Sequence, residues 1–182
     1  MSKRVLILHG WGGSDYPHWQ SWLAGEIAKE YGCVNFLKFS NFNEPKLDIW
    51  MHELKVALEE FKPHIIICHS LANTLWFHFC NRHKNVDEVE TLFLIAPPSN
   101  SCEIDELQEF FPVELPQNIH AKELLLVAST NDPYITMNEI RSLEKNLHCK
   151  TDILRDAGHI NTQSGYGEWE WIKEELKKRK AF

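Results

Sequence analysis

The sequence predicts an α/β fold, with a mostly parallel sheet of about six strands and helices on both faces. Short apolar runs alternate along the chain with segments whose apolar residues recur at helical spacing. Strands of a parallel sheet are buried on both faces and joined by helical crossovers, which produces this alternation. The chain has 182 residues, 43% of them hydrophobic, and it contains no long polar linker. We therefore expect one domain, residues 1–182, built around one sheet.

Six apolar runs have the length and composition of buried strands. The first, from Arg4 to His9, leads directly into a glycine-rich turn. A continuous apolar run bounded by such a turn is typical of a strand in a parallel sheet. The six predicted strands cover residues 4–9, 34–39, 65–68, 91–96, 124–129 and 150–154.

Between the strands lie segments whose apolar side chains fall on one helical face, as expected for helices that pack on a sheet. These faces are formed by Trp19, Trp22, Leu23 and Ile27; by Trp50, Leu54, Ala57, Leu58 and Phe61; by Met137, Ile140, Leu143 and Leu147; and by Trp169, Ile172 and Leu176. A further helix, rich in apolar residues, is predicted from about residue 71 to residue 81. The longest irregular segment, residues 97–122, could contain one short helix, and a loop of this length in a small domain usually has a function.

Composition and charge narrow the class of protein. The net charge of −7 argues against nucleic acid as the main partner, and no stretch approaches the ~20 apolar residues that a membrane span requires. Only four consecutive apolar residues follow the basic residues near the amino terminus, so we expect a cytoplasmic protein rather than a secreted one. The five cysteines form no C-x-x-C pair, which favours reduced thiols. The ten histidines show no H-x-x-x-H spacing, so we expect neither a metal nor a cofactor.

One polar stretch, Cys68-His69-Ser70-Leu71-Ala72, separates a predicted buried strand from a predicted buried helix. Its serine could cap the helix, since serine is among the preferred N-cap residues. It could also be the nucleophile of a strand–turn–helix elbow, usually written G-x-S-x-G, in which the sharp turn exposes the hydroxyl. Cys68 and Ala72 stand where that elbow has its glycines, and both are small. The stretch alone leaves both interpretations open.

A nucleophilic serine needs a histidine base and a carboxylate that orients the base. Asp132 follows the predicted strand 124–129, and His159 follows the predicted strand 150–154. In a parallel sheet both residues then lie with Ser70 at the carboxyl ends of strands, where open α/β sheets place their sites. Asp132 could instead be a simple turn former, and His159 a histidine of a surface loop. The order Ser, Asp, His is that of hydrolases with a nucleophile elbow, which favours the catalytic interpretation.

Two backbone N–H groups near the predicted nucleophile could stabilise an oxyanion. Leu71 follows the serine and would supply one of them. The glycine-rich turn after the first strand, residues 9–13, would supply the other through Trp11. The alternative for this turn is a phosphate-binding loop, but it lacks both the G-x-G-x-x-G spacing and the Gly-Lys-Ser/Thr ending.

Four segments resemble the small single-domain serine hydrolases that include retinoblastoma-binding protein 9 and bacterial YdeN-like proteins. They are HGWGGSDYPHWQSWL, IIICHSLAN, VASTNDPYI and DAGHIN, in this order over nearly the whole chain. The resemblance implies a compact α/β-hydrolase core without a large lid. It also implies Ser70 as nucleophile, Asp132 as acid and His159 as base. The chain departs from the family pattern at the elbow, where the family has glycine at positions 68 and 72.

The predicted activity is hydrolysis of an ester or amide of a small substrate through an acyl-enzyme intermediate. We expect His9, Gly10, Phe110 and Phe111 to contribute to substrate binding. One alternative is a hydrolase-fold protein of low turnover that binds a protein partner through residues 97–122, because fold does not fix function. A second alternative is an enzyme that uses Cys68 as nucleophile.

Overall fold

The computed structural model describes residues 3–182, which form a six-stranded, fully parallel sheet in the order β2-β1-β3-β4-β5-β6. The strands are β1 (Arg4–Leu8), β2 (Cys33–Leu37), β3 (Ile65–His69), β4 (Val89–Ile95), β5 (Ala121–Ser129) and β6 (Lys150–Leu154). Each strand pairs in register with its neighbours, so that the carboxyl ends of all six lie at one edge of the sheet. The predicted α/β fold class, with about six parallel strands, is confirmed.

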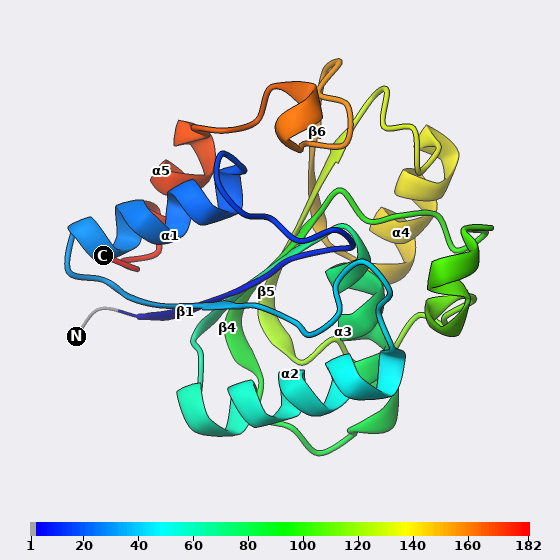
Figure 1. The fold of residues 1–182 in the computed structure, drawn as a ribbon, viewed down its shortest axis with the longest axis horizontal. Helices are drawn as coiled ribbons and strands as arrows, with labels where there is room; N and C mark the ends of the chain where they lie inside the picture. Colours follow the sequence, from blue (N-terminus) through cyan, green and yellow to red (C-terminus); the bar gives the residue numbers. More distant parts are fainter. Residues whose placement is uncertain (1–2) are drawn as a thin grey trace.

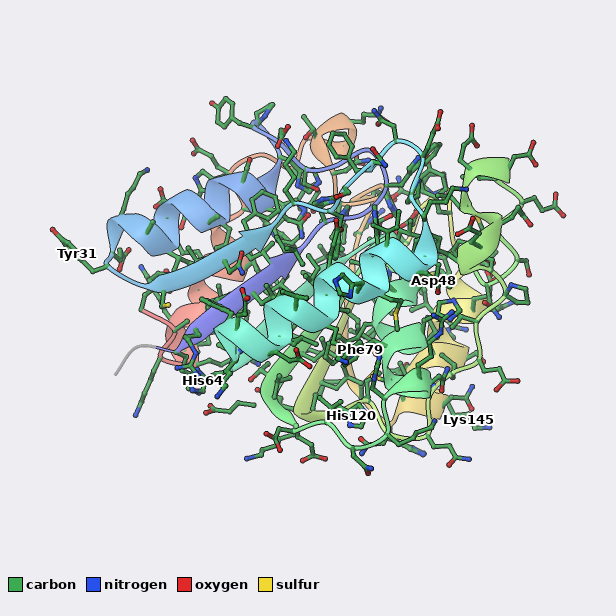
Figure 2. The ribbon with its side chains drawn as sticks, turned by 60° about the horizontal axis from the view of Figure 1, so that its bottom comes forward. Tyr31, Asp48, His64, Phe79, His120 and Lys145 are labelled. Atoms are coloured by element: carbon green, nitrogen blue, oxygen red, sulfur yellow. The ribbon has the colours of Figure 1, made fainter. Side chains whose placement is uncertain are left out.

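Helices cover both faces of the sheet (Figure 1). They are α1 (Trp19–Lys29), α2 (Leu47–Phe61), α3 (Leu71–Arg82), α4 (Met137–Leu147) and α5 (Glu170–Lys178), with short 3-10 helices η1 (Asp105–Phe110) and η2 (Thr162–Ser164). Helices α1 and α5 pack on one face, and α2, α3 and α4 on the other. Figure 2 shows α2 lying across the second face, with Phe79 of α3 beside it.

The alternation of side chains along each strand divides the core between these two faces. In β1, Val5 and Ile7 pack with α1 and α5, whereas Leu6 and Leu8 pack with α2 and α3. All four side chains are fully buried. This burial on both faces is why the first strand appears in the sequence as a continuous apolar run.

The strand order reverses between β1 and β3, because the chain runs from β1 outward to β2 and then returns to the other side of β1. Such a switch point leaves a crevice at the carboxyl ends of the two strands, and open α/β sheets bind ligands there. The two loops that leave this point are residues 9–18 and the turn at Ser70.

The structure extends or shortens several of the predicted elements. Strand β5 begins three residues before the predicted 124–129, because Ala121 to Glu123 pair with β4 although they are not fully buried. The segment 97–122 contains the one short helix expected of it, η1. Helix η2 had no apolar periodicity to predict it, since none of its residues is buried.

None of the helices within residues 3–182 is both long and apolar enough for a membrane crossing.

Candidate active site

Ser70 occupies a sharp turn between β3 and α3. Its backbone has φ 54° and ψ −126°, a conformation that non-glycine residues rarely adopt. Ser70 stands at the N-cap position of α3, but its side chain makes no capping hydrogen bond. The turn instead leaves the hydroxyl at the carboxyl end of β3. This geometry is the elbow expected of an exposed nucleophile rather than the geometry of a cap.

The backbone after β1 passes very close to this turn. A Cβ atom built on Gly10 would lie 2.7 Å from Ser70 Cβ and 3.1 Å from the backbone oxygen of His69. Only glycine allows the two segments to approach so closely. The approach brings Trp11 to the cavity that Ser70 and Leu71 also line. Leu71 is the first residue of α3, so its N–H belongs to the first helical turn, which has no intrahelical acceptor.

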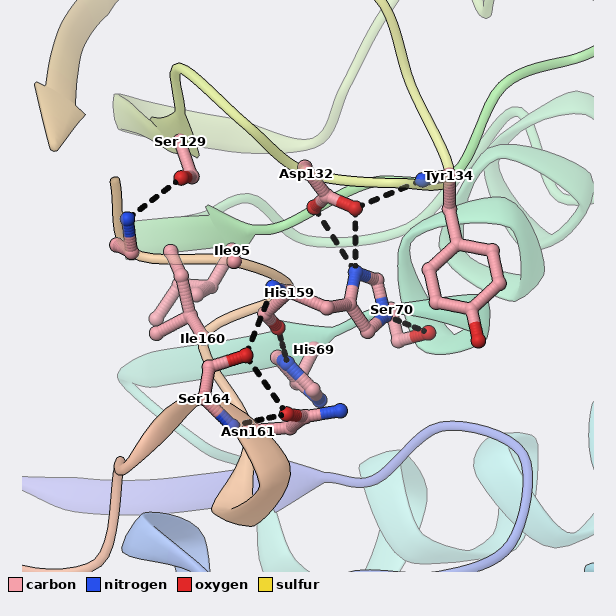
Figure 3. Close-up of polar contacts among 12 residues, drawn as sticks. His69, Ser70, Ile95, Ser129, Asp132, Tyr134, His159, Ile160, Asn161 and Ser164 are labelled. Atoms are coloured by element: carbon pink, nitrogen blue, oxygen red, sulfur yellow. Dashed lines mark hydrogen bonds and ion pairs between the residues drawn. The ribbon is translucent and has the colours of Figure 1, made fainter. Parts of the chain in front are cut away.

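Three side chains from three loops form one chain of hydrogen bonds (Figure 3). His159 Nε2 lies 2.8 Å from Ser70 Oγ. His159 Nδ1 lies 2.9 Å and 3.0 Å from the two carboxylate oxygens of Asp132. A carboxylate only accepts, so Nδ1–H donates to Asp132 and Nε2 is left to accept the hydroxyl proton of Ser70. The predicted residues of the three strand ends are thus brought together.

Asp132, and not the nearby Asp156, contacts the histidine. Asp132 is buried, and its Oδ1 also accepts a hydrogen bond of 2.9 Å from the backbone N–H of Tyr134. Asp156 lies three residues before His159 in the sequence, but it is exposed and contacts Thr130 through both its backbone and its side chain.

Residues that the sequence did not single out hold the loop of His159. The Nε2–H of buried His69 donates to the backbone oxygen of His159 at 3.1 Å, as Figure 3 shows. The backbone N–H of His159 donates to Ser164 Oγ at 3.1 Å, and Ser164 Oγ donates in turn to Asn161. The position of His69 at the end of β3, beside Ser70, accounts for its burial, but the hydrogen-bond partner of its ring lies 90 residues away in the sequence, so no local pattern indicates this contact.

A second set of polar contacts joins the loop of Asp132 to the loop of His159. Asn131 Oδ1 accepts from the backbone N–H of Gly158 at 2.7 Å and from Ser129 Oγ at 2.8 Å. Ser129 Oγ also accepts from the backbone N–H of Ala157 at 3.0 Å. Asn131 thereby fixes the distance between the two loops that carry the carboxylate and the imidazole.

Two further histidines are buried beside the site and stay neutral. Burial, with a smaller contribution from the neighbouring His159 and His9, lowers the pKa of His18 to about 4. Burial also holds the pKa of His69 well below its ordinary value. The His18 and His69 rings lie 5.1 Å apart, so a positive charge on one ring would repel a positive charge on the other.

Cys68 does not reach the cavity. Its side chain is fully buried among the residues that α2, α3 and α4 cover. Burial raises the pKa of the thiol well above its ordinary value, so the reactive thiolate is disfavoured. The geometry therefore does not support Cys68 as the nucleophile.

A cavity of about 630 Å³ opens in front of the Ser70 hydroxyl. Its walls come from the loop after β1, from residues 98–107 and from residues 132–139. Residues 97–122 thus cover part of the site. No Lys or Arg lines this cavity, and within residues 3–182 no cluster of histidine, cysteine or carboxylate side chains could hold a metal ion.

Of the predicted substrate-binding residues, the structure brings only some near the cavity. Gly10 packs against Ser70, and Phe111 lines a small pocket that adjoins the cavity. His9 lies behind the site, where its Nε2 accepts from the backbone N–H of Phe39 and its ring packs against core aromatic side chains. Phe110 is fully buried against Trp50 of α2. His9 and Phe110 are therefore buried and do not line the cavity at Ser70.

A nucleophile-type turn after the third strand of a parallel sheet, with helices on both faces, defines an α/β hydrolase. The chain belongs to the Serine hydrolase family, whose model matches residues 5–178. It is 22% identical over 171 residues to YdeN of Bacillus subtilis (strain 168), a protein to which hydrolase activity is ascribed; the match covers 91% of this chain and 90% of YdeN.

Solved structures share the fold at low sequence identity. The crystal structure of the ydeN gene product superposes with a TM-score of 0.86 at 19% identity, covering 97% of this chain and 98% of that one. A YdeN-like hydrolase from Pectobacterium atrosepticum gives 0.74 at 22% identity, with 97% and 90% covered. An esterase domain from Rhodothermus marinus gives 0.66 at 13% identity, with 96% and 84% covered.

Proposed function

We propose that this protein cleaves an ester or amide bond of a small substrate through a Ser70–His159–Asp132 catalytic triad. The observation that carries the proposal is the continuous hydrogen-bonded chain from the Asp132 carboxylate through the imidazole to a serine hydroxyl on a strained elbow. Membership of a serine hydrolase family and the fold shared with an esterase domain support it. We take residues 1–182 to act as one domain. The cytoplasmic location expected from the sequence stays a prediction.

The first half-reaction acylates the serine. His159 Nε2 takes the hydroxyl proton as Ser70 Oγ bonds to the substrate carbonyl carbon, and the carbonyl oxygen becomes an oxyanion. Asp132 holds the Nδ1–H tautomer and stabilises the imidazolium that forms. The intermediate then collapses, the bond to the leaving alcohol or amine breaks, and that group takes the proton from His159. The product is an acyl ester on Ser70.

The second half-reaction releases the acyl group. A water molecule gives a proton to His159 and attacks the acyl carbon, and Ser70 Oγ leaves with the proton that His159 returns to it. The N–H groups of Leu71 and Trp11 are the proposed oxyanion donors in both steps, since both residues line the cavity at Ser70. No step needs a metal or a cofactor.

The alternative function, a low-turnover protein that binds a partner through residues 97–122, is not favoured. These residues form one wall of the cavity at Ser70, which gives them a role within the hydrolase site. The three triad side chains also have their hydrogen bonds in place, and a protein selected only for binding would not need them.

A fluorophosphonate probe followed by mapping of the modified residue tests the proposal. We expect modification at Ser70, because its hydroxyl contacts a histidine base, and no modification at Ser99 or Ser101, which line the same cavity. Ser70→Ala should abolish labelling and lower the hydrolysis of p-nitrophenyl esters by roughly three orders of magnitude or more, with an unchanged denaturation midpoint within error. Retention of most activity in a folded Ser70→Ala protein would exclude Ser70 as nucleophile.

A further inference from the structure

A second, smaller pocket adjoins the cavity at Ser70. It has a volume of about 170 Å³ and lies between α3, α4 and the segment after β4. In Figure 1 that segment, coloured green, runs beside α4. The pocket and the cavity share four wall residues, Pro98, Ser99, Ile135 and Glu139, so the two hollows lie side by side.

The pocket beyond the shared wall is mainly apolar. Its apolar lining comes from Phe77, Phe111, Val113, Leu115 and Leu143. The volume is close to the roughly 150 Å³ of an apolar protein cavity that holds benzene. A group of about six carbon atoms would therefore fill it.

The shared wall carries a negative charge. Glu139 Oε1 accepts from Ser99 Oγ, and Oε2 accepts from both the N–H and the hydroxyl of Thr136. Burial alone would raise the pKa of Glu139, but these hydrogen bonds outweigh burial and lower it, so the carboxylate is ionised at neutral pH. Glu103 and Asp132 are the other carboxylates of the cavity, which no Lys or Arg lines.

Resting on the proposed function, we infer that the acyl group of the substrate is an uncharged apolar chain of about six carbons that occupies this pocket. A chain bonded to Ser70 would pass Glu139 to reach the apolar end. An acyl group that ends in a carboxylate would have to place its charge beside Glu139 and within apolar walls, and no cation in the lining would compensate it. Glu139 is thus a specificity-determining residue that rejects anionic acyl groups.

The first test compares p-nitrophenyl esters of increasing chain length. The kcat/KM should rise by about fourfold for each methylene between acetate and heptanoate, as the chain fills the pocket, and should fall for dodecanoate. Leu115→Ala removes an exposed part of the wall and should lower the heptanoate-to-acetate ratio several-fold. Leu58→Ala is the matched control, because Leu58 lines a hollow at the opposite edge of the sheet, beside His64 and Phe79 (Figure 2). A flat chain-length profile, or equal effects of the two variants, would overturn the inference.

The second test isolates the charge at Glu139. The mono-p-nitrophenyl ester of adipic acid matches the heptanoate ester in length but ends in a carboxylate. We expect its kcat/KM to be at least a hundredfold below that of heptanoate. Glu139→Gln should narrow this gap about tenfold, and glutamine can still close the capping box of α4. Glu144→Gln, which removes the same charge from α4 outside both pockets, should leave the gap unchanged.

The outcomes separate this inference from the proposed function. Equal rates for the adipate and heptanoate esters, or a gap that Glu139→Gln does not change, would overturn the inference while Ser70 remains the nucleophile. A protein whose Ser70 reacts with a fluorophosphonate but which does not hydrolyse heptanoate would also overturn it. Absence of both reactions would instead overturn the proposed function.

Discussion

At the scale of single residues, the proposed reactivity of Ser70 depends on a backbone conformation that L-residues disfavour. Its positive φ is held by the surrounding structure, since the N–H of Ser70 donates to Ile95 and its backbone oxygen accepts from both the backbone and the side chain of Asn73. The side chain of Asn73 also donates to Ile95. Two of these four hydrogen bonds tie the elbow to Ile95 at the end of β4, and the other two join Asn73 to Ser70, which together keep the strained turn in place.

Asp132, whose carboxylate contacts the imidazole of His159, is the second single residue on which the proposed mechanism depends. Asp132→Asn removes the charge that stabilises the imidazolium and disturbs the tautomer, so kcat should fall by about three to four orders of magnitude. Asp156→Asn is the matched control, because Asp156 contacts Thr130 and not the imidazole. Steady-state kinetics on a short p-nitrophenyl ester compare the two. A larger loss for Asp156→Asn would reverse the assignment.

Cys68 contributes packing at the elbow. It pairs with Leu8 and Leu94 in the centre of the sheet and is fully buried. Under the proposed function, Cys68→Gly should therefore keep its rate of p-nitrophenyl ester hydrolysis within a few-fold. It should lose about 1–3 kcal/mol of unfolding free energy, because a strand interior loses both a side chain and backbone restriction. We would measure kcat/KM beside a urea midpoint. Loss of activity in a still-folded Cys68→Gly protein, with Ser70→Ala active, would identify the cysteine as the nucleophile.

At the scale of elements, the site depends on how two loops are joined. The loop after β5 carries Asp132 and the loop after β6 carries His159, and Asn131 links them through Gly158 and Ser129. Catalytic geometry is sensitive to shifts of about 1 Å, which can cost as much as a hundredfold in rate. We therefore expect the link to matter for the proposed catalysis, although Asn131 makes no hydrogen bond to either side chain of the pair.

Asn131→Ala should lower kcat about tenfold or more, because the two loops would no longer share an acceptor. Asn131→Asp keeps an acceptor oxygen at the same position and should restore most of the rate. The measurement is kcat and KM separately for both variants, with the unfolding midpoint as a check on the fold. Equal losses in the two variants, or a change in KM alone, would contradict a positioning role for the amide.

At the scale of the whole molecule, the sequence predicts the sheet well because burial on both faces makes each central strand a continuous apolar run. Once the strands are parallel, the carboxyl ends carrying Ser70, Asp132 and His159 must meet at one edge. The sequence does not predict the contacts of His9, because its partner Phe39 is fixed only by the pairing of β1 with β2. The sequence likewise does not predict the place of Glu139 in the cavity wall, because that place depends on how α4 packs.

Global stability should depend on pH through the buried neutral histidines. His18 has a pKa of about 4 in the folded protein and an ordinary value of 6.5 when unfolded, so the unfolded chain binds more protons below pH 6.5. Its stabilising contribution is fully present above pH 6.5 and is lost as the pH falls toward 4. At about 1.4 kcal/mol per pKa unit, the loss by pH 5 is about 2 kcal/mol, and His69 acts in the same direction.

The variant His18→Asn separates this effect from other acid-sensitive groups. Asparagine is a good N-cap and can replace His18 at the start of α1, where the imidazole accepts from the backbone N–H of Gln20. Urea unfolding at pH 7.5 and pH 5 should show a smaller loss of stability for His18→Asn than for the wild type. His52→Asn, at an exposed position of α2, should behave as the wild type does. Carboxylates whose pKa is lowered in the folded protein, such as Glu26 with a pKa of about 2, stay ionised between pH 7.5 and pH 5. They therefore contribute little to the difference in unfolding free energy between these two pH values. A wild-type free energy of unfolding that is equal at the two pH values would show that His18 is not held neutral by the fold.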